Sequence, residues 1–111
     1  MIDLTEKRRQ DRMKLKGYMA DIAVGHFVFD GIVEDISAEG LRLNDLPTRF
    51  IIENKKYCIV VSDNTNSFSC KMQVSPRWKK KNGNYLEMGF NIAEVPSGWE
   101  TFVQQHAEQK G

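Results

Sequence analysis

The clearest structural signal in this chain lies in residues 68–74, which read FSCKMQV. Apolar and polar side chains alternate here, and successive side chains of a β-strand point to opposite faces of a sheet. The alternation predicts a strand with one face in a core and the other in solvent. Similar patterns occur at residues 14–24, 27–34, 41–43, 57–62 and 86–92. Several short strands separated by turns predict an all-β fold, a small antiparallel barrel.

Two features bear on how the later strands are joined. Pro76 follows residues 68–74 closely. Because proline lacks a backbone N–H, we expect it to end the regular pairing or to lie at a sheet edge. The sequence KKNG at residues 80–83 reads as a hairpin connection, since Asn-Gly accepts the positive φ that tight turns require.

The end of the chain changes from strand to helix periodicity. One helical face would carry Trp99, Phe102, Val103 and His106. We therefore expect a helix at about residues 97–109 that packs on the sheet, with Trp99 in the core.

Length and composition limit the organisation and the class of protein. A chain of 111 residues suits one domain, which we place at residues 13–111. The formal net charge of +1 does not suggest a partner that is a nucleic-acid polymer. No stretch approaches the roughly 20 apolar residues that span a bilayer, and the N-terminus lacks the apolar segment of a secretory leader. These features predict a cytoplasmic protein without a membrane span.

The sequence gives no sign of a metal centre or of catalysis. Cys58 and Cys70 are too few for a disulfide framework or a four-ligand zinc site, and we expect both to be reduced. His26 and His106 have no partners at a metal-ligand spacing. No Ser/His/Asp set, pair of perturbed acids or phosphate-cradling glycine loop is evident, so we expect neither an enzyme nor a cofactor.

Two short motifs carry the functional signal. Residues 8–12 (RRQDR) offer three cations within five residues, and residues 35–40 (DISAEG) offer a carboxylate, a hydroxyl and a flexible backbone. Arginine can bind phosphate oxygens or the edge of guanine with two hydrogen bonds. Together the motifs could hold a guanine nucleotide. Taken alone, the arginines would simply solvate a polar tail, and Asp, Ser and Gly are common turn formers.

The order and spacing of the motifs resemble those of the PilZ domain, the bacterial receptor module for cyclic di-GMP. The family pattern is Arg-x-x-x-Arg followed by Asp/Asn-x-Ser-x-x-Gly. The matching residues are Arg8, Arg9 and Arg12 in the first part and Asp35, Ser37 and Gly40 in the second. The resemblance implies a six-stranded antiparallel barrel with a C-terminal helix. Residues 1–12, which are polar and charged and lack strand periodicity, are expected to form a flexible, arginine-rich leader before it.

The resemblance also implies that these residues bind cyclic di-GMP as a ligand. Asp35 would accept hydrogen bonds from guanine, and Trp78 on a later strand would stack on a base. Binding would change the conformation and signal to an effector protein. One alternative is a PilZ-like interaction adaptor without nucleotide binding, which Glu39 beside the phosphate site and Pro76 favour. Another is a small barrel for single-stranded nucleic acid, which the near-neutral charge disfavours.

Overall fold

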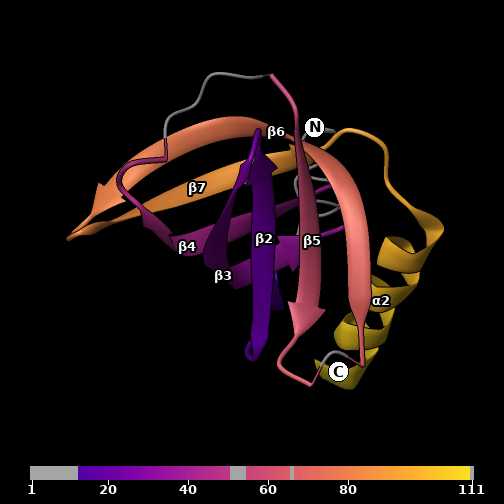
Figure 1. Ribbon diagram of the computed structural model, residues 1–111. Coiled ribbons are helices and arrows are strands. Elements are labelled where there is room, and N and C mark those ends of the chain that lie inside the picture. Colours follow the sequence, from indigo (N-terminus) through magenta and orange to yellow (C-terminus); the bar gives the residue numbers. More distant parts are fainter. Residues whose placement is uncertain (1–12, 51–54, 66, 111) are drawn as a thin grey trace, which may run out of the picture.

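The structure is a computed structural model that describes residues 13–50, 55–65 and 67–110. The expected leader, residues 1–12, lies outside the described residues. The elements are β1 (Met13–Lys14), β2 (Tyr18–Val24), β3 (Phe27–Ser37), β4 (Gly40–Pro47), β5 (Tyr57–Asp63), β6 (Ser69–Asn82), β7 (Tyr85–Ile92) and α2 (Ser97–Lys110) (Figure 1).

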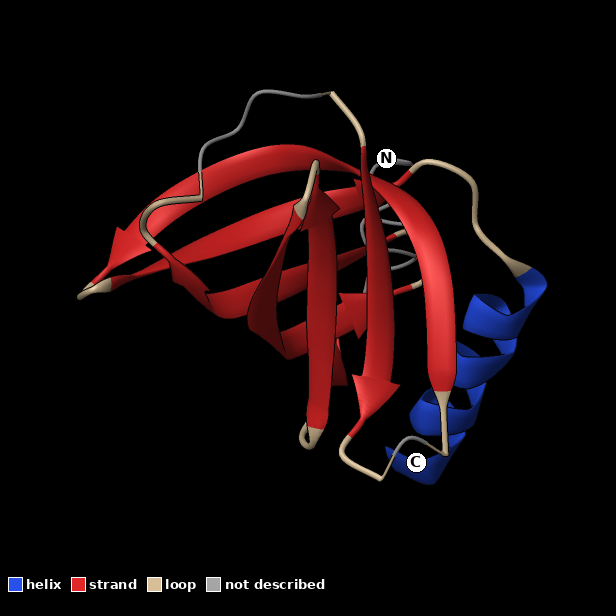
Figure 2. Ribbon diagram, viewed as in Figure 1, coloured by secondary structure: helices blue, strands red, loops and turns tan. Residues whose placement is uncertain are grey.

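Strands β2 to β7 form a closed antiparallel barrel (Figure 2). The ladder runs β3-β2-β5-β6-β7-β4, and β4 closes it by pairing with β3. Closure is possible because β3 is long: its first part pairs with β2, and its last part pairs with β4 on one side and β1 on the other. The predicted six-stranded barrel with a C-terminal helix is confirmed, with the two-residue β1 as an additional strand.

Strand β6 does not end at Pro76 but continues to Asn82, so the second expectation for this proline, a position at a sheet edge, applies. Its pairing with β5 ends at Val74, and beyond that residue it pairs with β7 alone among the described strands. Pro76 thus lies where one side of the strand has no ladder partner, so its missing N–H is tolerated. The register shifts between Pro76 and Trp78, which is a β-bulge or irregularity. The turn follows at residues 83–84, with Gly83 at a φ of 67°.

The alternating apolar residues of the sequence are the side chains that point into the barrel core. Inward-facing side chains from all six barrel strands are buried, and so are three residues of α2: Trp99, Phe102 and Val103. Phe102 stacks on Phe68, with ring centroids 4.1 Å apart, and meets the ring of Tyr18 edge-on at 5.3 Å. The helix therefore packs on the sheet, as the apolar stripe predicted, and the structure places it where β2 and β6 begin.

Both cysteines are free thiols, in agreement with the expected reduced state. Cys70 faces the core, and burial raises the pKa of its thiol.

Among the described residues, no helix has the length and apolar character needed to cross a membrane.

Two carboxylates lie opposite each other on the outside of the barrel. Asp21 on β2 is the ladder partner of Asp30 on β3. A hydrogen bond to the Asp30 side chain raises the pKa of Asp21, and burial and the charge of Asp30 raise it further. The folded state therefore binds this proton more tightly than the unfolded chain does. The resulting stabilisation is complete below about pH 3.9, the ordinary aspartate pKa, and is lost as the pH rises through the raised value.

We expect Asp21→Asn to stabilise the fold at pH 7, because it removes like charges that face each other across a ladder. The expected gain in the free energy of unfolding is about 0.2–1 kcal/mol, the range for cross-strand pairs. Urea denaturation at pH 7 and at pH 3 measures it, and the gain should shrink at the lower pH. Glu94→Gln removes an exposed charge elsewhere and serves as the control. A loss of stability at pH 7 would contradict this interpretation of the pair.

Candidate functional site

The motif at residues 35–40 forms the hairpin between β3 and β4. Ser37 pairs with Gly40 across a two-residue turn. A Cβ on Gly40 would lie 2.7 Å from the carbonyl oxygen of Phe90 on β7. The carbonyl of Glu39 also accepts a hydrogen bond of 2.9 Å from the amide of Ile92. A glycine is required at position 40 because the backbone of β7 passes directly beside it.

Ser37 connects this hairpin to the helix. Its hydroxyl donates to the carbonyl oxygen of Gly40 at 3.4 Å, within the turn. Its own carbonyl accepts a 3.1 Å hydrogen bond from the indole Nε1 of Trp99. Both Ser37 and Trp99 are buried. The motif is therefore held in position by α2, an element more than 60 residues away in the sequence.

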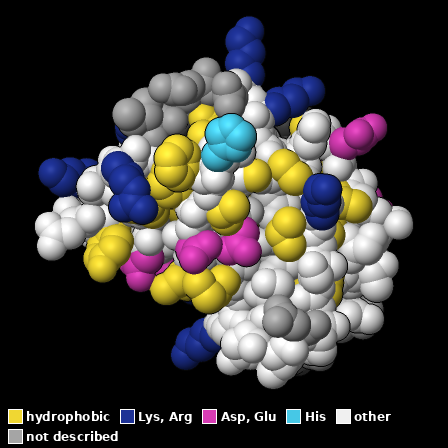
Figure 3. All heavy atoms as spheres, in the orientation of Figure 1, with side chains coloured by type: hydrophobic (Ala, Val, Ile, Leu, Met, Phe, Trp, Pro, Cys, Tyr) yellow, Lys and Arg dark blue, Asp and Glu magenta, His cyan; other side chains and the backbone are white. Residues whose placement is uncertain are grey.

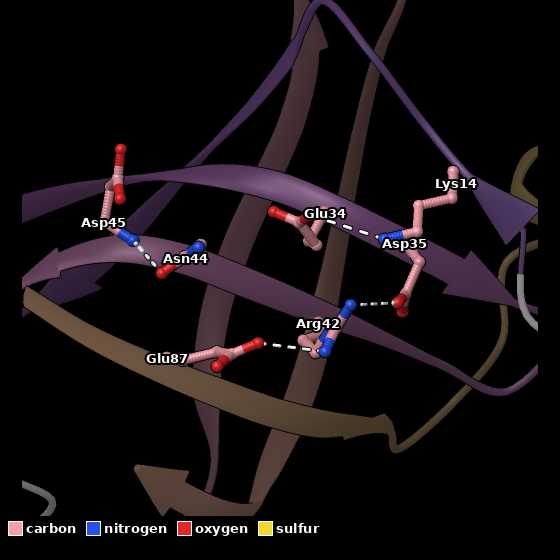
Figure 4. A network of polar contacts seen from close by, with 7 residues as sticks. All are labelled: Lys14, Glu34, Asp35, Arg42, Asn44, Asp45 and Glu87. Carbon is pink, nitrogen blue, oxygen red and sulfur yellow. Dashed lines mark hydrogen bonds and ion pairs between the residues drawn. The ribbon is translucent and has the colours of Figure 1, made fainter. Parts of the chain in front are cut away.

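Asp35 is buried and is held by an arginine that the sequence analysis did not single out. The Asp35 carboxylate lies 2.8 Å from one terminal nitrogen of Arg42 on β4, and the other terminal nitrogen lies 2.9 Å from Glu87 on β7. Figure 4 shows Arg42 between the two carboxylates. Charge-assisted hydrogen bonds of this kind fix side-chain direction as well as adding stability. The arginine thus fixes the direction in which Asp35 points.

Asp35 and Trp78 belong to one row of residues that crosses five strands. Ladder partners point to the same face of a sheet, and the successive partners are Lys14, Asp35, Arg42, Gly89 and Trp78. We call these five residues the transverse row. The row faces outward, because Leu41, Leu43, Met88 and Phe90 beside it face the core.

Gly89 provides the space in which the Trp78 side chain lies. A Cβ built on Gly89 would collide with the indole Nε1 of Trp78. The indole, which extends from β6, therefore lies over the backbone of β7 at Gly89. The side chain is still 38% exposed, so part of its surface is open to solvent. This geometry suits base stacking, because one part of the indole packs on the backbone of β7 and another part is exposed to solvent.

We expect Gly89→Ala to displace the Trp78 indole while the barrel remains folded, at a cost of about 1–3 kcal/mol for overpacking. Acrylamide quenching of tryptophan fluorescence measures the change, because Trp99 is buried and only Trp78 is accessible. Quenching should increase in this variant. Gly98→Ala, where a Cβ would meet open space, should leave it unchanged. Equal quenching in both variants would show that the ring does not depend on Gly89.

The structure describes four of the seven residues that the sequence singled out. Asp35, Ser37, Gly40 and Trp78 all lie on β3, β4 and β6 around the transverse row. The other three, Arg8, Arg9 and Arg12, lie outside the described residues. Three neighbours were missed: Arg42, Glu87 and Gly89. Arg42 could have been found from the sequence, because a two-residue turn at 38–39 makes residues 35 and 42 ladder partners.

The charges around the row are balanced. Lys14 lies 3.7 Å from Glu34, and Arg42 contacts both Asp35 and Glu87. Lys80 is the ladder partner of Glu87. Because the two cations of the row itself, Lys14 and Arg42, each have a carboxylate beside them, a phosphate bound at the row would need positive charge from other residues.

Neither a protein-family model nor a curated protein matches the sequence. Solved structures do match the fold. The inhibitor of motility MotI/DgrA of Bacillus subtilis has a TM-score of 0.73 at 12% identity, over 93% of this chain and 50% of its own. PlzA of Borreliella burgdorferi, in complex with c-di-GMP, has a TM-score of 0.70 at 14% identity, over 97% and 54%.

A third match covers nearly the whole of both chains. The PilZ domain of YcgR from Escherichia coli, with c-di-GMP, has a TM-score of 0.62 at 17% identity, over 94% of this chain and 96% of its own. The present chain spans about half the length of the first two proteins. All three neighbours are PilZ-domain proteins. The chain therefore has the fold of a PilZ domain.

Proposed function

We propose that this protein is a receptor for cyclic di-GMP. The observation that carries the proposal is the transverse row, which places the carboxylate of Asp35 and the open indole of Trp78 on one outer face of the barrel. Two of the structural neighbours contain this nucleotide, which supports the choice of ligand.

The separation within the row favours a ligand with two bases. Asp35 on β3 and Trp78 on β6 are three strand spacings apart, about 14 Å. Because the indole leans across Gly89, the open gap between the two groups is shorter than that. One guanine would stack on Trp78, and the other would donate its N1–H and N2–H to Asp35. Base stacking contributes about 1–3 kcal/mol, and hydrogen bonds to a charged group contribute about 1.5–3 kcal/mol.

Arg42 would act as a positioning residue in this arrangement. Both of its terminal nitrogens already contact carboxylates, so it is not the source of the phosphate contacts. We assign those contacts to Arg8, Arg9 and Arg12, which would supply the positive charge that the balanced row lacks. Ser37 and Gly40 would shape the hairpin at the edge of the site.

Binding of the ligand would change the surface that the protein presents to a partner. Binding would order residues 1–12 against the barrel, and an effector protein in the cytoplasm would read the new surface, as in other order–disorder switches. We propose a binding module that signals, and neither an enzyme nor a cofactor is part of the proposal.

An adaptor that does not bind nucleotide is the second candidate. The observation in its favour is that Arg42 already bridges Asp35 and Glu87. In that case the bridge would be a structural part of the barrel wall, and the row would present no unsatisfied acceptor for guanine.

Isothermal titration calorimetry with cyclic di-GMP separates the two candidates. The receptor predicts saturable binding of cyclic di-GMP, with GTP and a short single-stranded oligonucleotide giving much weaker heats. Arg12→Glu should abolish that binding without unfolding the barrel, because it reverses the charge of one of the three assigned arginines. Absence of binding by the folded parent protein would reject the receptor, and equal binding by Arg12→Glu would reject the assignment of the leader.

A further inference from the structure

A second surface of the barrel combines apolar and acidic side chains. It lies on the outer side of β2, β3 and β5, which no helix of the described chain covers (Figure 1). Three apolar side chains are exposed on it: Met19 at 43%, Val28 at 61% and Ile32 at 42%. Figure 3 shows this side of the molecule, with acidic side chains among apolar ones. Exposed apolar groups that cluster in this way mark interaction sites in many proteins.

The ladder register defines the surface. Ile32 is paired with Met19, Asp30 with Asp21, and Val28 with Ala23. On β5, Val60 is the partner of Asp21, and Cys58 is the partner of Ala23. We call this set the β2–β3 face. The two carboxylates therefore lie side by side, with apolar neighbours on both sides of them along the strands.

The carboxylates of the β2–β3 face are not neutralised by the described part of the protein. Neither Asp21 nor Asp30 forms an ion pair with a lysine or arginine of residues 13–50, 55–65 or 67–110. The nearest cation along that row is Lys71 on β6, with Val60 between it and Asp21. Like charges opposite each other destabilise a sheet. The fold itself therefore gains nothing from this pair at neutral pH.

We propose that the β2–β3 face docks a segment of a partner protein that carries a lysine or arginine flanked by apolar side chains. The cation would lie between Asp21 and Asp30, and the apolar side chains would cover Met19, Val28 and Ile32. Charge complementarity selects this occupant. An anionic membrane or a nucleic acid would be repelled, and a second copy packed about a two-fold axis through the pair would bring four carboxylates together.

The proposal is independent of cyclic di-GMP binding, because none of its residues belongs to the transverse row. It extends the proposed function by placing a partner on a different face from the nucleotide. Failure of one proposal therefore leaves the other standing, and both can be measured on the same samples.

The test is a chemical-shift titration of the ¹⁵N-labelled full chain with synthetic peptides. The probe alternates Leu and Lys, and the two controls alternate Leu with Glu and Ser with Lys. The probe should shift amides of β2, β3 and β5 and reach saturation, while both controls bind much more weakly. Shifts that map elsewhere, or equal binding of the Leu/Glu control, would overturn the proposal. So would concentration-dependent shifts of the same amides without peptide, since these would mark self-association.

Two variants complete the test. Asp21→Lys should fold, because it replaces like charges by an opposite pair with Asp30. Its affinity for the probe peptide should be lower than that of the parent by about tenfold or more. Ile32→Ser should lower the affinity for the probe peptide, because an apolar contact is lost. Both variants should bind cyclic di-GMP as the parent does. Unchanged probe affinity in Asp21→Lys would overturn the role of charge, and unchanged affinity in Ile32→Ser would overturn the apolar contact.

Discussion

Replacing Trp99 by alanine is expected to lower the free energy of unfolding by about 3–5 kcal/mol, the usual cost of truncating a large buried aromatic side chain. Trp99 is fully buried, and its indole donates to the carbonyl of Ser37. The substitution would leave a cavity between α2 and the barrel and deprive that carbonyl of its donor. Urea denaturation monitored by circular dichroism measures the loss.

Trp78→Ala is the matched control, because it removes the same side chain from a partly exposed position. It should cost clearly less than Trp99→Ala. Trp99→Phe should fall between the two, since it keeps a ring in the core but loses the hydrogen bond, which contributes about 0.5–1.5 kcal/mol. Similar losses for Trp78→Ala and Trp99→Ala would contradict the assignment of Trp99 as the link between the helix and the hairpin.

Replacing Asp35 by alanine is expected to weaken cyclic di-GMP binding by about five- to 150-fold. The expected cost is about 1–3 kcal/mol, because the guanine N–H groups would lose their acceptor. The barrel should stay folded, since Arg42 keeps its contact with Glu87. Calorimetric titration of the variant measures the effect.

Asp30→Ala is the matched control for this prediction. It removes a carboxylate from the outer side of the same strand, away from the transverse row. Its affinity for cyclic di-GMP should equal that of the parent protein. Equal affinities for Asp35→Ala and the parent would show that Asp35 does not contact the base.

Much of the barrel could be predicted from the sequence, because alternation along a strand directly reflects which side chains face the core. Residues 86–92 show this well, since all the expected inward side chains are buried. Pro76 was harder to interpret. Whether a proline interrupts a strand depends on which side of that strand is paired, and the loss of the β5 partner after Val74 is a property of the closed barrel.

The candidate site was only partly predictable for a similar reason. The motif at residues 35–40 identified Asp35, but Arg42 and Gly89 come from other strands and act through pairing across the sheet. Gly40 is a further case. The sequence indicated only a flexible backbone at this position, and the structure shows the carbonyl of Phe90 beside it. Contacts between distant strands determine these roles, and short motifs do not contain them.

The most direct test of the cyclic di-GMP site is a ¹H–¹⁵N titration of the chain with this nucleotide. We expect shifts of the Trp78 indole signal and of the amides of Asp35, Arg42 and Gly89. The amides of Asp21 and Ala23, on the β2–β3 face, should stay unchanged. Saturable shifts at Asp21 and Ala23 with none at Trp78 or Asp35 would place the ligand elsewhere and contradict the account.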